Sequence, residues 1–477
     1  MNESPPKNTE TQGRSQSGLR RFALILCGAL LVVLIGILLP RSDKRTAPGK
    51  ATSLAKTTSA QSSDHSLWNV TFERFRLHRN RNSSPAPTAE EIVTNQLSLL
   101  AHNRREVLHN MAQAWNLQVP ADFDRFFDIA QAGQWDKLQG FFGTMMTNRQ
   151  NGVWSEAASK LWPAVLETYG AAEAAHKWPA QQLLNYGDAV LGALRPGEVY
   201  TGGTDPGRFI PTLLNETADG PQNVVLTQNA LADGSYLNYL GFLYGDRLNT
   251  LTHDDSQKAF ETYIADARKR FEHDRDFPNE PKQIRPGEMI QITEEGRVNV
   301  SGQVAVMAIN EKLFQTLMDK NPDTSFAIEQ SFPFKSTYAN ATPVGPIMEL
   351  RVNDEQNALT AERASQSVDY WTTTTQQLLS DPTSANSPEV SHAYSKMAAE
   401  QASLFLDHNL PTEAEQLFRL ATQISPESPE VTFRYLNLLM GQNRVADAIS
   451  VADNAVKADP SNAQFQQLLD ALKKQKH

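Results

Sequence analysis

The amino-acid sequence predicts an α/β fold with helical hairpins before it, an α-solenoid after it and one transmembrane helix near the N-terminus. Three stretches carry this prediction. Residues 198–216 read as a strand, a glycine-rich loop and a helix, small residues near the C-terminus recur with a fixed period, and residues 22–40 lack charged side chains. The expected segments are a cytoplasmic head (1–21), a transmembrane anchor (22–40), a linker with a juxtamembrane segment (41–87), a helical region (88–194), an α/β domain (195–355), a helical connector (356–391) and the repeats (392–477).

Length and charge set the first limits on function. A chain of 477 residues exceeds the usual size of one domain and predicts two or three folded units. The formal charge is −10, but the first 50 residues carry 8 Lys and Arg against 3 Asp and Glu, so the remainder is strongly acidic. Binding to nucleic acid needs clustered basic side chains, and the acidic part of the chain therefore predicts no nucleic-acid partner.

The N-terminal apolar run predicts a membrane anchor. Its nineteen residues, Phe22–Pro40, would form a helix about 28 Å long, which is enough to cross a bilayer core. Arg20 and Arg21 precede it, and the rest of the chain is large and acidic, which favours a cytoplasmic head. The protein is therefore expected to be a single-pass inner membrane protein with its bulk in the periplasm. Cys27 is the only cysteine and lies within this run, so no intramolecular disulfide can form.

The linker has two parts. Residues 41–66 are rich in Ser, Thr, Ala and Lys without apolar periodicity and are typical of a flexible spacer. Residues 66–82 mix aromatic side chains with arginines, which is compatible with a helix at the lipid headgroups or with a packing segment whose arginines are solvated.

Helical periodicity begins at Thr88 and continues to about Leu194. Residues 123–146 read as two helices with a turn at Gly133, which is typical of an antiparallel hairpin. Pro163 and Pro179 are expected to break the following helices.

The central part alternates between strand and helix signals. The run Glu198–Gly203 reads as a strand, Asp205–Asn215 as a helix and Asn223–Asn229 as a second strand. Further strand signals lie at residues 289–292, 325–331 and 346–352, whereas residues 303–309 fit a strand or the start of a helix. Alternation of this kind favours a largely parallel sheet covered by helices.

The C-terminal part contains a countable repeat. Four pairs of residues lie 34 positions apart, which is the tetratricopeptide period. The two units are 392–426 and 427–460, and a last helix at 461–473 would cap the stack. The pairs are Phe405 and Leu439, Ala414 and Ala448, Ala421 and Ala455, and Pro426 and Pro460. Such repeats predict a surface for a protein partner.

The glycine-rich loop after the first strand contains two candidate ligand-binding residues, Asp205 and Arg208. Exposed N–H groups at a helix N-terminus favour an anion, and Arg208 would pair with it. Asp205 would repel a phosphate but suits a sugar hydroxyl. The structural alternative is that Asp205 caps the helix and that Pro206 occupies its first turn. The loop matches neither of the two common phosphate-binding glycine motifs.

Asn229 and Asp233 are two further candidates, because they follow the second strand and would face the same crevice if the strands are neighbours. The alternative for Asp233 is a turn with Gly234. His253 and His273 have acidic neighbours without the spacing of a zinc motif, so no metal and no cofactor are expected. The sequence also lacks a nucleophile elbow, and catalytic residues stay unknown.

Three blocks, at 162–216, 223–246 and 325–352, resemble the extracytoplasmic C-terminal region of bacterial protein O-mannosyltransferase-like membrane proteins, which contain a domain of unknown function. The blocks include the motifs EVYTGGTDPGRF and NVVLTQNALADGSY. The resemblance implies an extracytoplasmic α/β module joined to tetratricopeptide repeats. Glycosyltransferase chemistry in that family resides in a polytopic membrane part that this sequence lacks, so the activity is not transferred to Asp205 or Asp233.

Two functional hypotheses follow. The favoured one is a membrane-anchored accessory module, without enzymatic activity, that binds a protein partner through its repeats and acts in envelope glycan or glycoprotein assembly. The alternative is an enzyme, related to glycosyltransferases, or a sugar-binding domain that uses the Asp205 and Asp233 crevice. A glycan is the ligand expected in the second case.

Overall fold

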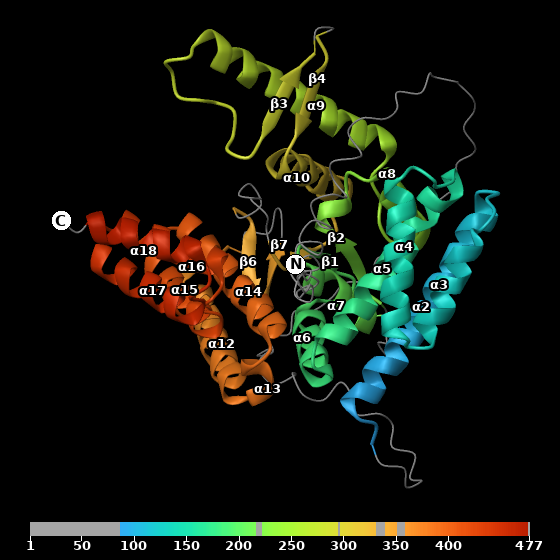
Figure 1. Ribbon diagram of the computed structural model, residues 1–477, viewed down its shortest axis with the longest axis horizontal. Coiled ribbons are helices and arrows are strands. Elements are labelled where there is room, and N and C mark those ends of the chain that lie inside the picture. Colours follow the sequence, from blue (N-terminus) through green and yellow to red (C-terminus); the bar gives the residue numbers. More distant parts are fainter. Residues whose placement is uncertain (1–85, 216–221, 294–295, 331–338, 351–357, 476–477) are drawn as a thin grey trace, which may run out of the picture. The chain divides into compact units, whose positions relative to one another are not determined.

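The computed structural model describes residues 86–215, 222–293, 296–330, 339–350 and 358–475 (Figure 1). The described residues fall into two compact units. The smaller is Phe260–Ile309, and the larger lies within His78–Ala259 and Asn310–His477. Residues 22–40 lie outside the described part, and within that part no helix is both long and apolar enough to span a bilayer. The segment rich in aromatic residues and arginine at 66–82 also lies outside it.

The larger unit begins with the helices predicted between residues 88 and 194. The first is fixed by a capping box, in which Thr88 and Glu91 each accept a hydrogen bond from the backbone N–H of the other. The helices are α2 (Ala89–Ala114), α3 (Ala121–Gln131), α4 (Trp135–Gln150), α5 (Glu156–Lys177) and α6 (Ala180–Ala193).

The expected break at Pro163 is wrong, because Pro163 lies inside α5. A proline there leaves the carbonyl of Ser159 without its helical partner. Ser159 is exposed, so water can hydrate that carbonyl. Pro179, in contrast, is the N-cap residue of α6, and a helix boundary lies there as expected.

Aromatic side chains form the contact between α4 and α5. The rings of Phe142 and Tyr169 are stacked with their centroids 3.6 Å apart, and Phe142 also stacks on Trp162 at 5.3 Å. Large buried rings of this kind contribute most to the core of a helical layer. The two helices are therefore held as a rigid pair beside the sheet.

A five-stranded sheet follows, in the order β2-β1-β5-β7-β6. Strand β1 pairs in parallel with β2 and β5, whereas β7 pairs antiparallel with β5 and β6. The strands are β1 (Val199–Gly202), β2 (Val224–Thr227), β5 (Phe326–Ile328), β6 (Ala341–Val344) and β7 (Ile347–Leu350). The sheet is small and most regular structure is helical, so the α/β description holds only for the middle of the chain.

The expectation of a largely parallel sheet is therefore only partly right. Strand β6 gave no strand signal, and it turns directly into β7 at Gly345, whose φ of +57° is readily adopted by glycine. A tight turn of this kind enforces antiparallel pairing, whereas parallel strands need a long crossover.

Helices cover both faces of this sheet. On one face, α6 and α7 (Asp205–Asn215) pack against the side of β1 and β5 that carries Tyr200 and Glu329. On the other face, the ring of Phe314 from α10 (Gln303–Lys320) makes an edge contact with Phe326, with centroids 5.8 Å apart. The carboxyl ends of β1 and β5 are thus neighbours at the edge where the loop with the two candidates Asp205 and Arg208 begins.

The smaller unit contains most of α9 (His253–Asp276), a hairpin of β3 (Met289–Ile292) and β4 (Val298–Ser301), and the first part of α10. Strand β3 was expected in the main sheet, but it pairs only with β4, after a turn containing Gly296. Residues 303–309, for which strand and helix were both open, are helical. Glu288 is buried in this unit and accepts two hydrogen bonds from Arg270 and one from Tyr263.

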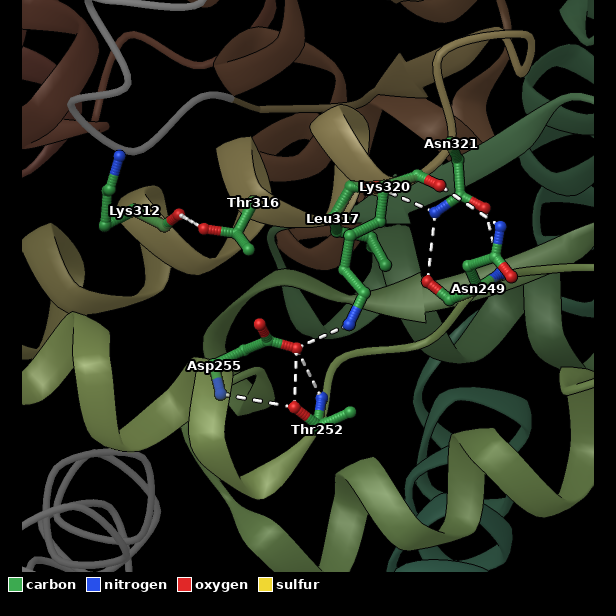
Figure 2. Close-up of polar contacts among 8 residues, drawn as sticks. All are labelled: Asn249, Thr252, Asp255, Lys312, Thr316, Leu317, Lys320 and Asn321. Atoms are coloured by element: carbon green, nitrogen blue, oxygen red, sulfur yellow. Dashed lines mark hydrogen bonds and ion pairs between the residues drawn. The ribbon is translucent and has the colours of Figure 1, made fainter. Parts of the chain in front are cut away.

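The chain leaves the larger unit after Ala259 and returns to it at Asn310, and polar contacts join the two connections (Figure 2). The backbone N–H of Asn249 donates to Oδ1 of Asn321 at 2.8 Å, and Nδ2 of Asn321 donates to the carbonyl of Asn249 at 3.0 Å. Nζ of Lys320 lies 2.5 Å from Oδ2 of Asp255. Burial alone would raise the pKa of this carboxyl, but the contact with Lys320 and the hydrogen bonds from Thr252 lower it to about 2.

The C-terminal part of the larger unit is entirely helical within the described residues. Helices α14 and α15 form one hairpin and α16 and α17 the next, and Figure 1 shows them in succession from orange to red. Both turns contain an asparagine with positive φ, Asn409 at +58° and Asn443 at +59°, 34 residues apart. The helices are α12 (Ala361–Ser380), α13 (Pro382–Ala385), α14 (Pro388–Asp407), α15 (Pro411–Ile424), α16 (Pro429–Gly441), α17 (Val445–Ala458) and α18 (Ala463–Gln475).

Candidate functional site

The loop after β1 surrounds a carboxylate that belongs to the chain itself. Glu329 directly follows β5 and is 1% exposed. Its Oε2 accepts hydrogen bonds from the backbone N–H groups of Gly203 at 3.1 Å and Thr204 at 3.0 Å, and its Oε1 accepts from the Thr204 hydroxyl at 2.6 Å. Charge-assisted hydrogen bonds of this kind satisfy a buried carboxylate. The N-terminus of α7, which was expected to attract an anion, therefore binds the side chain of Glu329.

Tyr186 of α6 completes the coordination of Glu329. Its hydroxyl donates to Oε1 at 2.9 Å, and burial together with the Glu329 charge holds the pKa of Tyr186 well above its usual range. The phenol thus stays protonated and remains a donor. Four donors from two segments, the β1–α7 loop and α6, converge on one carboxylate, and this fixes α6, the end of β5 and the start of α7 to one another.

Gly207 is required for this arrangement. A Cβ atom added to Gly207 would lie 1.7 Å from Oε2 of Glu329, far inside any real contact distance. The backbone N–H of Gly207 donates to Oγ1 of Thr204 at 3.0 Å, so Thr204 holds the capping position that was proposed for Asp205. Threonine suits this position because its hydroxyl accepts from the backbone N–H of Gly207 and donates to Glu329 at the same time.

A second tyrosine compensates for the proline inside α7. Pro211 has no N–H to offer to the carbonyl of Gly207, four residues earlier. The hydroxyl of Tyr200 donates to that carbonyl at 2.7 Å, and Tyr200 is fully buried. The Gly207 carbonyl, which Pro211 leaves without a helical donor, is therefore satisfied within the chain.

Asp205 and Arg208 pair with each other at the rim of the loop. Nη2 of Arg208 lies 2.6 Å from Oδ1 of Asp205, and the two side chains are 20% and 49% exposed. The guanidinium of Arg208 also lies over the ring of Phe209, with 4.3 Å between its Cζ and the ring centroid. The two charged groups that were expected to bind a ligand thus form an ion pair with each other.

Asn229 lies beside the same loop, and β1 and β2 are parallel neighbours as the crevice prediction requires. Nδ2 of Asn229 donates to the carbonyl of Gly203 at 3.3 Å. Asp233 is the N-cap of α8 (Gly234–Tyr244), and its Oδ1 accepts from the backbone and the hydroxyl of Ser235 at 2.8 and 2.6 Å. Asn229 therefore contacts the loop that carries Asp205 and Arg208, whereas Asp233 caps α8.

A pair of buried carboxyl groups lies at the start of the sheet. Glu198 and Glu349 are each 3% exposed and contact each other, and Arg195 donates from Nη2 to Glu349 at 3.0 Å. Burial, and then the neighbouring Glu198 charge, raises the pKa of Glu349 to about 7. Sequence reasoning missed both this pair and Glu329, because glutamates in short strands are usually exposed. Within the described residues, no three side chains of His, Cys, Asp or Glu gather closely enough for a metal ion.

The C-terminal repeats form a packed stack around the residues that recur every 34 positions. The alanines of the second helices, such as Ala414 and Ala448, are fully buried, which lets neighbouring helices approach closely. Phe405 and Leu439 occupy equivalent positions and are also fully buried. The last helix, α18, lies within two residues of its predicted bounds and has a polar outer surface that includes Gln466, Gln467 and Asp470.

The first repeat is joined to the sheet through one side chain. Gln401 of α14 is fully buried, and its Nε2 donates to the carbonyls of Gly345 and Ile347 in the β6–β7 hairpin at 3.0 and 3.2 Å. Its Oε1 accepts from the hydroxyl of Ser367 and from Nε1 of Trp371, both on α12, at 2.6 and 2.9 Å. This side of α14 is therefore occupied within the chain.

The first helices of the repeats are linked by ion pairs. Arg434 of α16 lies 2.7 Å from the buried Glu400 of α14 and 2.8 Å from Glu430, and Glu430 lies 3.7 Å from Lys396. Lys396 and Glu430 are 34 residues apart, as are Glu400 and Arg434. Equivalent positions thus meet across the repeats and form continuous rows.

Comparisons with known proteins identify only the repeats. Residues 405–472, from the last three residues of α14 into α18, match the tetratricopeptide repeat family. No curated protein and no solved structure matches the chain. The repeat part of the predicted resemblance is therefore supported, whereas nothing in these comparisons bears out a relationship to protein O-mannosyltransferase-like proteins.

Proposed function

We propose that this protein is a membrane-anchored, extracytoplasmic interaction module that binds a protein partner through α14–α18. The observation that carries the proposal is the match of residues 405–472 to tetratricopeptide repeats, which are protein-interaction modules, together with the stacked hairpins of that region. The anchor, the extracytoplasmic location and a role in envelope glycan assembly rest on the apolar run at 22–40 and on the family resemblance.

The face that we assign to the partner is formed by the first helices of the repeats, α14, α16 and α18. Side chains at equivalent positions reach solvent in each of them, so they form a strip that continues across the stack. We call this strip the first-helix face, and it consists of Lys396, Ser403, Glu430, Asn437, Gln464 and Ala471. This face is not needed to attach the repeats to the rest of the chain, because Gln401 makes that attachment to the β6–β7 hairpin.

The test compares two matched substitutions in the full chain. Asn437→Arg places a large cation in the middle of the first-helix face, whereas Asn454→Arg makes the same change at an exposed position of α17. Cells are treated with a crosslinker that cannot cross membranes, and the crosslinked partner is captured and quantified. Truncation of the repeats is a poorer test, because removal of Gln401 would also disturb the β6–β7 hairpin.

We expect Asn437→Arg to reduce the crosslinked partner roughly thirtyfold, since a disrupted interface centre costs on the order of 2 kcal/mol, and Asn454→Arg to leave it unchanged. Equal capture by both variants would exclude the first-helix face. Partner capture that needs a membrane-permeable crosslinker would place the repeats in the cytoplasm and contradict the proposed location.

A further inference from the structure

A cavity of about 300 Å³ opens in the larger unit where α12, α13, α14 and α15 meet. It lies at the start of the repeats and shares no residue with the first-helix face. Its walls combine apolar with polar side chains, namely Leu379, Ala385, Asn386, Pro388, Ser391, Gln423, Ile424, Pro426 and Glu427. The volume is at the lower end of the range for small-molecule sites, which suits one long side chain.

The apolar part of the wall suits an aliphatic chain. Leu379 is 49% exposed although it is large and apolar, and Ile424 is 6% exposed beside it. Two prolines, Pro388 and Pro426, add rigid apolar surface. Contact with a hydrocarbon stem would remove this surface from water and would therefore be favourable.

The polar part of the wall offers hydrogen-bond acceptors. The side chains that contact Glu427, His392 at 3.2 Å and Ser425 at 2.9 Å, both contact Oε1. The backbone N–H of Glu427 also contacts the carboxylate, and a ligand can reach it at Oε2, which neither of those two side chains contacts. The contact with His392 outweighs burial and lowers the pKa of Glu427, so the carboxylate is charged at neutral pH. Asn386 donates from Nδ2 to the carbonyl of Pro382 at 2.8 Å, which leaves its Oδ1 as the unused end of the amide.

Ser391 adds to the same pattern. Its hydroxyl hydrogen is used on the carbonyl of Ser387 at 3.0 Å, so the oxygen that lines the cavity can only accept. Gln423, the other polar residue of the wall, can donate or accept. With acceptors on Glu427, Asn386 and Ser391, the wall suits a ligand that supplies several N–H donors and a positive charge. Phosphate, carboxylate and other anions do not meet this requirement.

We infer that this cavity binds an arginine side chain of the protein partner, with its aliphatic stem against Leu379 and Ile424 and its guanidinium against Glu427 and Asn386. Arginine fits better than lysine because its planar fork carries five donors for acceptors that lie in different directions. The inference rests on the proposed function for the origin of the arginine. The cavity itself can be tested without the partner.

The experiment measures saturation-transfer difference NMR on the full-length protein, a method that detects weak ligands of large proteins. The probes are N-acetyl-arginine methylamide and N-acetyl-citrulline methylamide, which have nearly the same shape but differ in charge. The test variant is Glu427→Gln, and the matched control is Glu413→Gln, which changes a carboxylate of α15 that lies outside both the cavity wall and the first-helix face. A third variant, Leu379→Lys, places a resident cation at the partly exposed rim.

We expect saturation of the arginine methylene protons, at least a fivefold weaker effect for citrulline, and a loss of roughly fivefold in affinity in Glu427→Gln, the upper end for partly exposed ion pairs. Leu379→Lys should reduce the signal as well, and Glu413→Gln should not. Equal signals for arginine and citrulline, or an unchanged signal in Glu427→Gln, would overturn the inference. Arginine binding that persists when Asn437→Arg fails to affect partner capture would exclude the first-helix face and leave the cavity assignment standing.

Discussion

Replacement of Gly207 by alanine tests the central contact of the sheet edge. The added methyl group would lie 1.7 Å from Oε2 and 2.3 Å from Oε1 of Glu329, so the carboxylate has to move by more than 1 Å. Movement of that size breaks its hydrogen bonds with Gly203, Thr204 and Tyr186. Each buried donor left without a partner costs about 1–3 kcal/mol, and we expect Gly207→Ala to lower the free energy of unfolding by about 3–5 kcal/mol.

A double-mutant cycle separates this effect from ordinary helix chemistry. In a Glu329→Ala background the obstructing carboxylate is absent, and alanine at position 207 gains up to about 1 kcal/mol over glycine inside a helix. Gly207→Ala should then be neutral or stabilising, which gives a coupling free energy of about 3 kcal/mol or more between the two positions. Gly192→Ala is the control, because a Cβ on that glycine in α6 meets no atom within 4 Å.

Equilibrium urea unfolding followed by tryptophan fluorescence is the appropriate assay. The tryptophans of the described residues all belong to the larger unit, so the signal reports on the unit that contains Gly207 and Glu329. If Gly207→Ala costs the same free energy with and without Glu329, the carboxylate is not what the methyl group displaces, and the role assigned to this contact is incorrect.

Two further substitutions probe other buried polar groups with the same assay. Because the pKa of Glu349 is raised from 4.5 to about 7, the folded state retains a proton that the unfolded state loses in this range, so stability should fall by up to about 3 kcal/mol as the pH rises from 4.5 to 7. Glu349→Gln should reduce this slope, leaving the shares of Asp188 and Glu198, whose pKa values are also raised by burial, and an unchanged slope would contradict the assignment. Gln401→Leu should cost about 3–5 kcal/mol because it leaves two carbonyls and two donors unpaired, whereas the exposed Gln416→Leu should cost little; equal urea midpoints for the two variants would count against the role of Gln401.

Local pattern was sufficient for two parts of this fold. The strand, loop and helix at 198–216 follow from a β-prone run, two glycines and Asp205-Pro206, and the helix bounds agree with those expected. The repeats follow from a period that places the same small residue in the same packing position twice, as at Ala414 and Ala448. In both cases the information lies within one element or one fixed interval.

The remainder depends on contacts between distant residues. Thr204 and Glu329 are 125 positions apart, and no residue near either of them indicates that they form one site. Gln401 is read as a polar residue on an exposed helix face until the β6–β7 hairpin is placed against it. Strand β6 escaped notice because it contains Pro343, which disfavours a strand except at a sheet edge, and β6 is an edge strand.

The hydrogen bonds of Gln401 also limit where a further repeat unit could be added to the stack. Proteins of this type lengthen by duplication of whole units, and a new unit needs a free helix face on which to stack. One side of α14 is already committed to α12 and the sheet hairpin, so an inserted unit before it would have to break four buried hydrogen bonds. A unit duplicated after α14 would break none of these four hydrogen bonds. The start of the array therefore stays fixed, and new units can be added only beyond α14.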